Sequence, residues 1–216
     1  MLFNELMDHS KNLVSHWDTA YHKDDEQLGW FESNPESTLQ LINACHLKKE
    51  ASILNVGSGT TVLIDALLDQ GYTNIIANDL SEVALTKLKK RIQEKYDVDL
   101  NCMSDDLTNP TCLKKLRNID LWIDRAVLHF FLKKEEQQAY FNLIHKVIAK
   151  KGYVLIAVFS LDGAEKCCGL DLQRYNLEML QQGLGKAFKL LETFNFTYIN
   201  PFGDKRPYIY TLFQKQ

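Results

Sequence analysis

Two glycines and an aspartate stand at the ends of two short apolar runs. Gly57 and Gly59 follow the run ILNV (residues 53–56), and Asp79 ends the run NIIAN (residues 74–78), 20 residues after Gly59. Glycines at a strand end let the backbone approach a ligand, and the next helix directs free N–H groups at it. A carboxylate after the second strand accepts hydrogen bonds from ribose hydroxyls. The spacing therefore predicts a site for an adenosine-containing cofactor.

Each part of this pattern also has a purely structural interpretation. A Gly-x-Gly turn occurs in many α/β proteins for packing alone, and Asp79 is placed to cap a helix that begins near Ser81. The full dinucleotide pattern would have glycine or alanine where this chain has Val62. An acidic pair, Asp105-Asp106, follows the third apolar run. The combination favours the adenosine site, and Val62 argues against a nicotinamide dinucleotide.

Regular alternation of strands and helices must position these residues. Strands are expected at 52–56, 74–78, 98–103, 119–124 and 153–159, with helices at 61–70, from Ser81 onward and at 135–149. Such alternation implies right-handed crossovers and a doubly wound, mainly parallel sheet with helices on both faces. After a loop around 162–169 and a helix near 176–182, residues 188–198 and 208–214 alternate like two strands. A short connection makes them an antiparallel C-terminal hairpin, which gives seven strands in all.

The first 50 residues form a separate zone. Apolar residues recur at helical spacing, namely Leu2, Phe3, Leu6, Met7, Leu13 and Val14. An aromatic connector, WDTAYHKDDEQLGWFESN (residues 17–34), follows, and Asn34 is expected to cap a helix whose first residue is Pro35. We expect residues 1–50 to be a helical and aromatic lid segment on a single globular domain that comprises residues 51–216.

Composition excludes several classes of protein. The chain has 216 residues, of which 45% are hydrophobic and 25% charged, and its formal net charge is −3. These are ordinary values for one globular domain, and a slightly acidic chain without a basic tract is poorly suited to bind nucleic acid. No apolar run approaches the roughly 20 residues that span a bilayer, and the N-terminus lacks a secretory signal pattern. Five cysteines without metal-ligand spacing favour a cytoplasmic setting.

From about Trp17 to its C-terminus the chain resembles the Rossmann-like (class I) family of S-adenosylmethionine (SAM) dependent methyltransferases. LNVGSGTT (residues 54–61) resembles the family's glycine motif, Asp79 its ribose-binding acid and Asp106 its adenine-contacting acid. IDLWIDRAVLHFF (119–131) resembles the fourth-strand motif, and KKGYVLIAVF (150–159) resembles the strand after the fifth helix. The terminal hairpin also matches. HWD…Y…GWFE…P near the N-terminus and PFG…Y…F near the C-terminus are similar to a group of small bacterial methyltransferases.

The resemblance implies a set of functional residues. Those expected to bind SAM, or its product S-adenosylhomocysteine, are Trp17, Tyr21, Trp30, Asn55, Gly57, Ser58, Gly59, Asp79, Leu80, Asp106, Leu107 and Asp124. Candidates near the transferred methyl group are Asp124, Arg125 and His129. Two positions depart from the family pattern, because Asn55 replaces the acid of the glycine motif and Thr61 replaces its third glycine.

The alternatives for the fourth-strand residues stay open. Asp124 either holds the methionyl part of the cofactor or pairs with Arg125. His129 is a candidate general base, but its neighbours Leu128, Phe130 and Phe131 are typical of a buried structural histidine. The aromatic residues Trp17, Tyr21, Trp30 and Phe31 either close over the sulfonium or simply pack the N-terminal segment.

Methyl transfer from a sulfonium requires alignment of donor and acceptor and exclusion of water, and no metal is expected. The acceptor is expected to be a small molecule or, alternatively, a protein side chain such as lysine. A nicotinamide-dependent oxidoreductase and an inert binding protein of the same fold are the competing interpretations. The motif Lys166-Cys167-Cys168-Gly169 is interpreted as a pocket-wall loop rather than a metal or redox site. Arg174, Tyr175 and Arg206 are expected near the same rim, either to recognise an anionic acceptor or as solvated surface residues.

Overall fold

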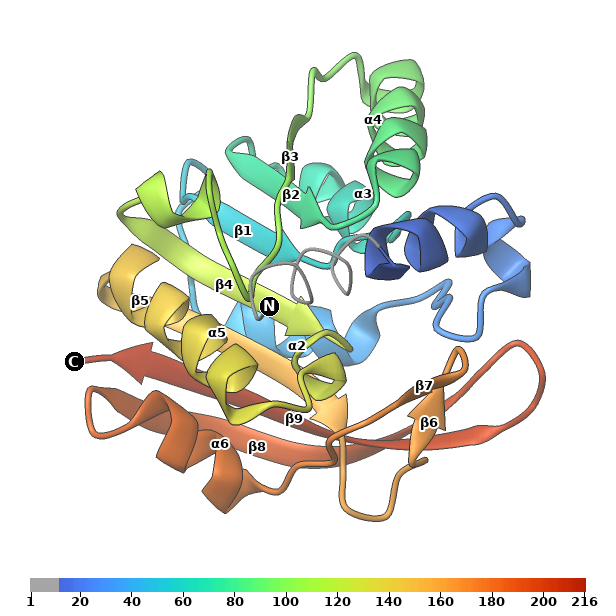
Figure 1. Cartoon of the computed structure of the whole chain (residues 1–216). Coiled ribbons are helices and arrows are strands. Elements are labelled where there is room, and N and C mark those ends of the chain that lie inside the picture. Colours follow the sequence, from blue (N-terminus) through green and yellow to red (C-terminus); the bar gives the residue numbers. More distant parts are fainter. Residues whose placement is uncertain (1–11) are drawn as a thin grey trace.

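A seven-stranded mixed sheet forms the centre of the protein (Figure 1). The computed structural model describes residues 12–216. The strands run in the order β3-β2-β1-β4-β5-β9-β8. Their bounds are β1 Ile53–Val56, β2 Ile75–Asp79, β3 Asn101–Ser104, β4 Ile119–Arg125, β5 Ile148–Phe159, β8 Phe188–Ile199 and β9 Lys205–Lys215. Strands β1 to β5 are parallel, and the β8–β9 hairpin adds two antiparallel strands beside β5. The expected doubly wound sheet with its C-terminal hairpin is confirmed.

Side chains of successive strand residues enter two separate cores, one on each face of the sheet. Ile53 and Leu54, for example, are both fully buried but belong to opposite faces. Helices α2 (Glu36–Ala44), α3 (Leu63–Asp69) and α4 (Glu82–Tyr96) cover the first face. Helices α5 (Lys134–Val147) and α6 (Leu177–Leu184) and the 3-10 turn η2 (Leu113–Lys115) cover the second. Strands buried on both faces explain the continuous apolar runs in the sequence.

The carboxyl ends of the parallel strands meet at one edge of the sheet, which lies on the right in Figure 1. A helix at residues 12–20 and the turn η1 (Asp25–Gln27) cover this edge. The turn η3 (Leu128–Phe130) follows β4 at the same edge, and the connection between β8 and β9 also lies there. In this fold class ligands bind at the carboxyl ends of the strands. The arrangement therefore places the N-terminal segment over the expected site.

The structure corrects several local expectations. Helix α2 begins at Glu36 with Pro35 as its N-cap, so Asn34 is not the cap and Pro35 is not the first helical residue. The segment expected to be a loop around 162–169 contains the first strand of a small antiparallel hairpin, β6 (Lys166–Cys167) and β7 (Leu170–Asp171). Strand β5 begins at Ile148, because the chain passes directly from α5 into a bulged extension of the strand.

The N-terminal zone divides into two parts. The helix expected from the apolar residues Leu2 to Val14 falls mostly on residues 1–11, which lie outside the described residues. Helix α2 belongs to the globular core, because Leu41 and Ile42 are fully buried in it. Among the residues that the structure describes, the covering segment is therefore residues 12–33. In the described part of the chain, every helix is too short or too polar to cross a bilayer.

Candidate active site

The glycine turn after β1 requires both of its glycines. Gly57 and Gly59 have φ angles of +54° and +51°, in the left-handed region that glycine adopts without strain. A Cβ atom added to Gly57 would overlap the side chain of Val127, and one added to Gly59 would overlap the hydroxyl of Tyr21. The N–H of Ser58 donates to the carbonyl of Asn78 at 2.8 Å and ties the turn to β2. The turn is therefore fixed in shape and closely covered.

Asp79 lies directly against this turn, as the sequence predicts. Its carboxylate accepts hydrogen bonds from the backbone N–H groups of Gly59 at 2.7 Å and Ser81 at 2.9 Å. Burial raises the pKa of Asp79 to about 6, although these hydrogen bonds act in the opposite direction. The cap of α4 is a different residue, since the Ser81 hydroxyl accepts from the N–H of Ala84. Asp79 thus organises both the glycine turn and the start of α4.

The two acidic residues after β3, Asp105 and Asp106, make different contacts. The carboxylate of Asp105 accepts from the backbone of Thr111, Cys112 and Leu113, which lowers its pKa despite burial. Asp105 therefore stabilises the loop before η2. Asp106 is half-buried and accepts from the N–H and hydroxyl of Thr108.

The two leucines expected to contact the cofactor lie in different surroundings. Leu80, directly after Asp79, is half-buried. Leu107 is 5% exposed and packs in the core under α5. Of the two, only Leu80 keeps appreciable accessible surface.

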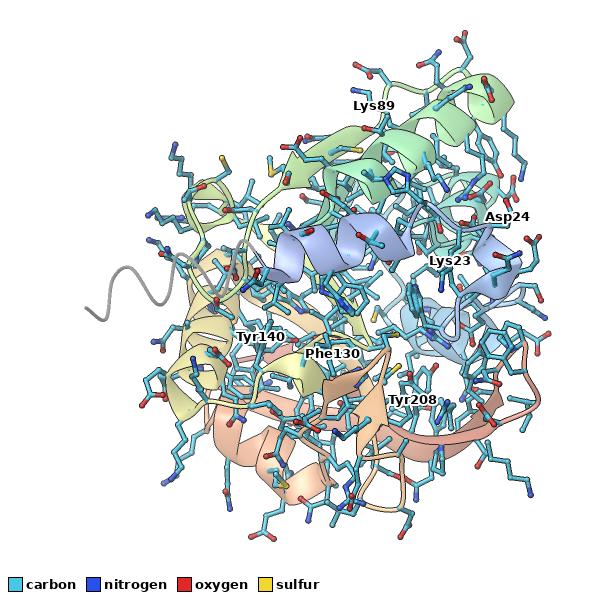
Figure 2. The ribbon with its side chains drawn as sticks, turned by 45° about the vertical axis from the view of Figure 1, so that its right-hand side comes forward. Lys23, Asp24, Lys89, Phe130, Tyr140 and Tyr208 are labelled. Atoms are coloured by element: carbon cyan, nitrogen blue, oxygen red, sulfur yellow. The ribbon has the colours of Figure 1, made fainter. Side chains whose placement is uncertain are left out.

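The aromatic residues of the N-terminal segment converge over the glycine turn. Trp17 packs edge-to-face against both Trp30 and Phe130, with ring centroids 5.6 and 5.0 Å apart. Tyr21 packs on Trp30 in the same way at 5.6 Å, and its hydroxyl lies over Gly59. Figure 2 shows the helix at residues 12–20 passing above Phe130. The structure therefore brings Trp17, Tyr21 and Trp30 together at the place the sequence predicts.

Polar side chains fasten this segment to α4 and to the glycine turn. Asp18 accepts a hydrogen bond from the Ser81 hydroxyl at 2.6 Å, and Asp25 accepts one from the Thr60 hydroxyl at 2.7 Å. Arg91 donates to the carbonyls of Thr60 and Thr61 and lies 3.8 Å from Asp25. One guanidinium therefore touches both the turn and the covering segment.

A cavity opens beside the glycine turn, between the turn and the covering segment. Its lining residues are Leu28, Trp30, Phe31, Glu32, Pro35, Thr38, Asn55, Gly57, Ser58, Thr60, Thr61, Leu63 and Arg125. Within residues 12–216, the Oδ1 atom of Asn55 and the hydroxyl of Ser58 are buried without a hydrogen-bond partner. Buried polar atoms without partners are costly, so each one calls for an explanation. A polar ligand in the cavity would satisfy both atoms.

A buried ion pair forms one wall of the cavity. Arg125 Nε lies 2.9 Å from a carboxylate oxygen of Glu32, and both side chains are largely buried. Arg125 also donates to the carbonyl of Trp30 at 3.1 Å and lies over the rings of Tyr198 and Tyr208. Burial raises the pKa of Glu32, although Arg125 opposes this. Arg125 is a candidate from the sequence, whereas Glu32 occurs there only as the last residue of the GWFE motif and has no predicted role.

Asp124 stabilises the backbone next to the cavity. It is fully buried and accepts hydrogen bonds from the Tyr140 hydroxyl at 2.6 Å and from the N–H groups of Val127 and Leu128. The expected alternative that it pairs with Arg125 is wrong, because Arg125 pairs with Glu32. Burial raises the pKa of Asp124 to about 6. Asp124 thereby holds Val127 against Gly57 and shapes the glycine turn indirectly.

His129 is fully buried and does not line the cavity. Its Nδ1 atom accepts a weak hydrogen bond from the N–H of Phe159 at 3.4 Å, and its ring packs against Phe130 and Phe159. Burial, assisted by the charge of Arg125, lowers the pKa of His129 to about 3. The imidazole is therefore neutral near pH 7.

The rim residues are distributed differently from the expectation. Tyr175 is 2% exposed and lies in the core under α5 and α6. Arg174 pairs with Glu165 at 3.2 Å and Arg206 with Asp204 at 3.0 Å. Among the described residues, no group of three or more His, Cys, Asp or Glu side chains is arranged to hold a metal ion.

Comparison with known proteins agrees with this geometry. Residues 53–152, from β1 into β5, match the family model described as "Methyltransferase domain". The fold matches a crystal structure of the Burkholderia thailandensis 1,6-didemethyltoxoflavin-N1-methyltransferase with a TM-score of 0.75 and 18% identity, over 97% of this chain and 90% of that one. The chain is therefore similar to methyltransferases over 100 of its 216 residues, and it shares the fold of the solved methyltransferase structure.

Two curated relatives of this chain carry the name EEF1A lysine methyltransferase 2. The protein from Mus musculus is 26% identical over 165 residues, which cover 69% of this chain, and the protein from Danio rerio is 24% identical over 155 residues, which cover 65%. Each alignment spans 66% of the relative's own length. The matched B. thailandensis structure contains bound 1,6-didemethyltoxoflavin and S-adenosylhomocysteine.

Proposed function

We propose that this protein transfers the methyl group of SAM to an acceptor and releases S-adenosylhomocysteine. The observation that carries the proposal is the contact between Asp79 and the glycine turn, beside a cavity that holds two unpartnered polar atoms. A carboxylate at this point suits the ribose hydroxyls of an adenosine group. The match of residues 53–152 to the methyltransferase model and the fold shared with a solved methyltransferase support the same proposal.

The residues present fit a cofactor of this kind. Asp79 would hold the ribose, Leu80 and Asp106 would lie beside the adenine, and the glycine turn would accommodate the chain that links ribose to sulfur. The unpartnered Oδ1 atom of Asn55 and hydroxyl of Ser58 would bind the amino-acid end in the cavity. Asn55 adds no negative charge, but its Oδ1 atom can accept a hydrogen bond from the ammonium group of the cofactor. When bound, SAM supplies an electrophilic methyl group on a sulfonium.

The chain's own contribution is to position the reactants and exclude water. The aromatic group of Trp17, Tyr21 and Trp30 covers the turn. We propose that residues 12–33 are a lid that closes over the cofactor. Arg125 lies on the cavity wall and would orient the acceptor or the amino-acid end of the cofactor. His129 is buried away from the cavity and neutral, so it would keep Phe130 and Phe159 in place rather than accept a proton from the acceptor.

We propose a small molecule as the acceptor. The lid and the buried Glu32–Arg125 pair enclose the cavity, and an enclosed pocket suits an acceptor that is taken up whole. A protein lysine is the second candidate, favoured by the names of the two curated relatives. Both are compatible with the same cofactor site.

The test incubates the full chain with methyl-labelled SAM and two fractions of one cell extract, separated by size into metabolites and proteins. We expect label in the metabolite fraction. Label confined to a lysine of one protein would favour the second acceptor. The absence of labelled acceptor in either fraction, with no binding of S-adenosylhomocysteine by calorimetry, would overturn the proposed activity.

A further inference from the structure

The turn between β6 and β7 has an unusual residue in its first central position. Cys168 and Gly169 have φ angles of +54° and +79°, and the flanking Cys167 and Leu170 are paired across the hairpin. Two positive φ angles define a two-residue turn in which Asn-Gly is the favoured sequence. A cysteine in this conformation costs free energy that asparagine or glycine would largely avoid. The presence of cysteine at this position therefore suggests a role for its thiol.

The turn brings two thiols together. The sulfur atoms of Cys167 and Cys168 lie 3.5 Å apart, and both residues are half-buried, so small solutes can reach them. No atom lies within 4 Å of the position that a side chain on Gly169 would occupy, so the turn has open space beside it. The described residues contain three more free cysteines, but Cys45 is buried, and burial raises the pKa of both Cys45 and Cys102. Cys112 is exposed.

The charges around the pair favour a thiolate on Cys167. A hydrogen bond from the Cys168 thiol lowers the pKa of Cys167, and the guanidinium groups of Arg206 and Arg125 act in the same direction against burial. The pKa of Cys168 is raised, chiefly by its hydrogen bond to Cys167 and by burial. A low-pKa thiol next to a second thiol is the arrangement of a redox-active pair, because the first reacts with an oxidant and the second resolves the product.

We infer that Cys167 and Cys168 are a reversible thiol–disulfide modification site whose oxidant is a hydroperoxide. The Cys167 sulfur attacks the terminal peroxide oxygen, so that an S–O bond forms and the O–O bond breaks; the other oxygen leaves as hydroxide from hydrogen peroxide or as alkoxide from an organic hydroperoxide. The Cys168 sulfur then attacks the Cys167 sulfur, so that an S–S bond forms, the S–O bond breaks and water leaves with the remaining proton. Two sulfurs lose two electrons to the peroxide, and a dithiol restores the reduced pair by exchange.

The location of the pair gives the modification a consequence. The guanidinium of Arg125, which lies over the ring of Tyr208 and lines the cavity, also acts on the pKa of Cys167. Figure 2 shows the β6–β7 hairpin beside Phe130 and Tyr208, on the side of the N-terminal segment. Oxidation joins the two sulfurs and changes the backbone of the turn near this arginine. The inference goes beyond the proposed methyl transfer and does not depend on it.

The experiment uses the full chain without cofactor, treated with hydrogen peroxide at the same concentration as the protein. Thiols are then alkylated before and after reduction, and the modified positions are mapped by peptide mass spectrometry. We expect Cys167 and Cys168 to lose alkylation together, with a peptide lighter by two hydrogen atoms, and to regain it after dithiothreitol. They should react before the exposed Cys112.

Two variants sharpen the result. Cys168→Asn places the favoured residue in the turn, so the fold is retained, and Cys167 should then stop at a sulfenic acid that dimedone traps. Cys112→Ser should leave the oxidation of the pair unchanged. Oxidation of Cys112 alone, or equal dimedone labelling of Cys167 in the wild type and in Cys168→Asn, would overturn the inference, whatever the result of the methyl-transfer assay.

Discussion

The carboxylate of Asp79 accepts a hydrogen bond of 2.7 Å from the backbone N–H of Gly59, 20 residues earlier in the chain. This bond joins the end of β2 to the glycine turn after β1, so both halves of the proposed cofactor site are held in one rigid unit. The same carboxylate accepts from Ser81 at the start of α4, where the covering segment is attached through Asp18. Asp79 and Ser81 therefore stabilise both the glycine turn and the attachment of the covering segment.

The lid proposal makes a prediction about Asp25. Asp25→Asn weakens a hydrogen bond from Thr60 and the attraction of Arg91, and such charge-assisted contacts are worth about 1.5–3 kcal/mol. We expect the amide hydrogens of residues 12–33 to exchange about tenfold faster than in the wild type. Addition of S-adenosylhomocysteine should slow this exchange less than it does in the wild type. The adjacent Asp24 is exposed and makes no side-chain cap hydrogen bond, so Asp24→Asn is the matched control. Wild-type exchange that is the same with and without S-adenosylhomocysteine would contradict the lid.

A substitution in the glycine turn separates steric overlap from backbone strain. Gly59→Ala forces alanine into a left-handed conformation and against the Tyr21 hydroxyl, so we expect a loss of about 1–3 kcal/mol in the free energy of unfolding and weaker binding of S-adenosylhomocysteine. Combining it with Tyr21→Phe removes the nearest overlapping atom, the hydroxyl, but leaves a ring carbon at 2.9 Å and the backbone strain. In urea unfolding, the double variant should lose less free energy of unfolding than the sum of the losses in the two single variants. Purely additive losses would mean that the Tyr21 hydroxyl does not contact the turn.

The raised pKa of Asp79 predicts a pH dependence of cofactor binding. The carboxyl group of the ligand-free protein has a pKa of about 6, above the ordinary value near 3.9, so it takes up a proton as the pH falls through 6. Ribose hydroxyls require the ionised form, and the dissociation constant for S-adenosylhomocysteine should approach a tenfold rise per pH unit below 6. Calorimetry from pH 7.5 to 5 checks this. Asp79→Asn should show weak binding with little pH dependence; a wild-type dissociation constant that is flat across this range would count against the assignment.

His129→Ala tests the structural role of the buried imidazole. The ring packs between Phe130 and Phe159, so its removal should lower the free energy of unfolding by about 2–5 kcal/mol. The affinity for S-adenosylhomocysteine should stay within about twofold of the wild type, because His129 does not line the cavity. Methyl transfer by the folded fraction should persist. Its complete loss in a variant that is fully folded and binds the cofactor normally would show that the histidine acts in catalysis.

Local patterns were sufficient to predict the sheet and the central pair of the site. Apolar runs followed by Gly57 and Asp79 identify strand ends, and parallel strands necessarily bring those ends to one edge. The alternation of residues 188–198 and 208–214 likewise predicted the hairpin, because strands joined by a short loop pair antiparallel. These features depend on neighbours in sequence.

Local sequence patterns could not predict contacts between segments that lie far apart in the chain. The Glu32–Arg125 pair joins residues 93 positions apart, and no periodicity indicates that two charged side chains share a buried site. Asp124 has the same sequence context whether it faces a ligand or, as here, the hydroxyl of Tyr140 on α5. The β6–β7 turn was missed because Cys168 occupies a position at which Asn or Gly is the usual signal.

The binding of S-adenosylhomocysteine to Asp79→Ala tests the account most directly. The substitution removes charge-assisted hydrogen bonds to the ribose, each worth roughly 1.5–3 kcal/mol before compensation by water. Isothermal titration calorimetry at pH 7.5 should show at least about tenfold weaker binding than the wild type. The control, Asp99→Asn, removes an exposed ion pair with Lys89 and should bind normally. Circular dichroism establishes that both variants are folded. Wild-type affinity in a folded Asp79→Ala variant would contradict the adenosine site, and with it the proposed methyl transfer.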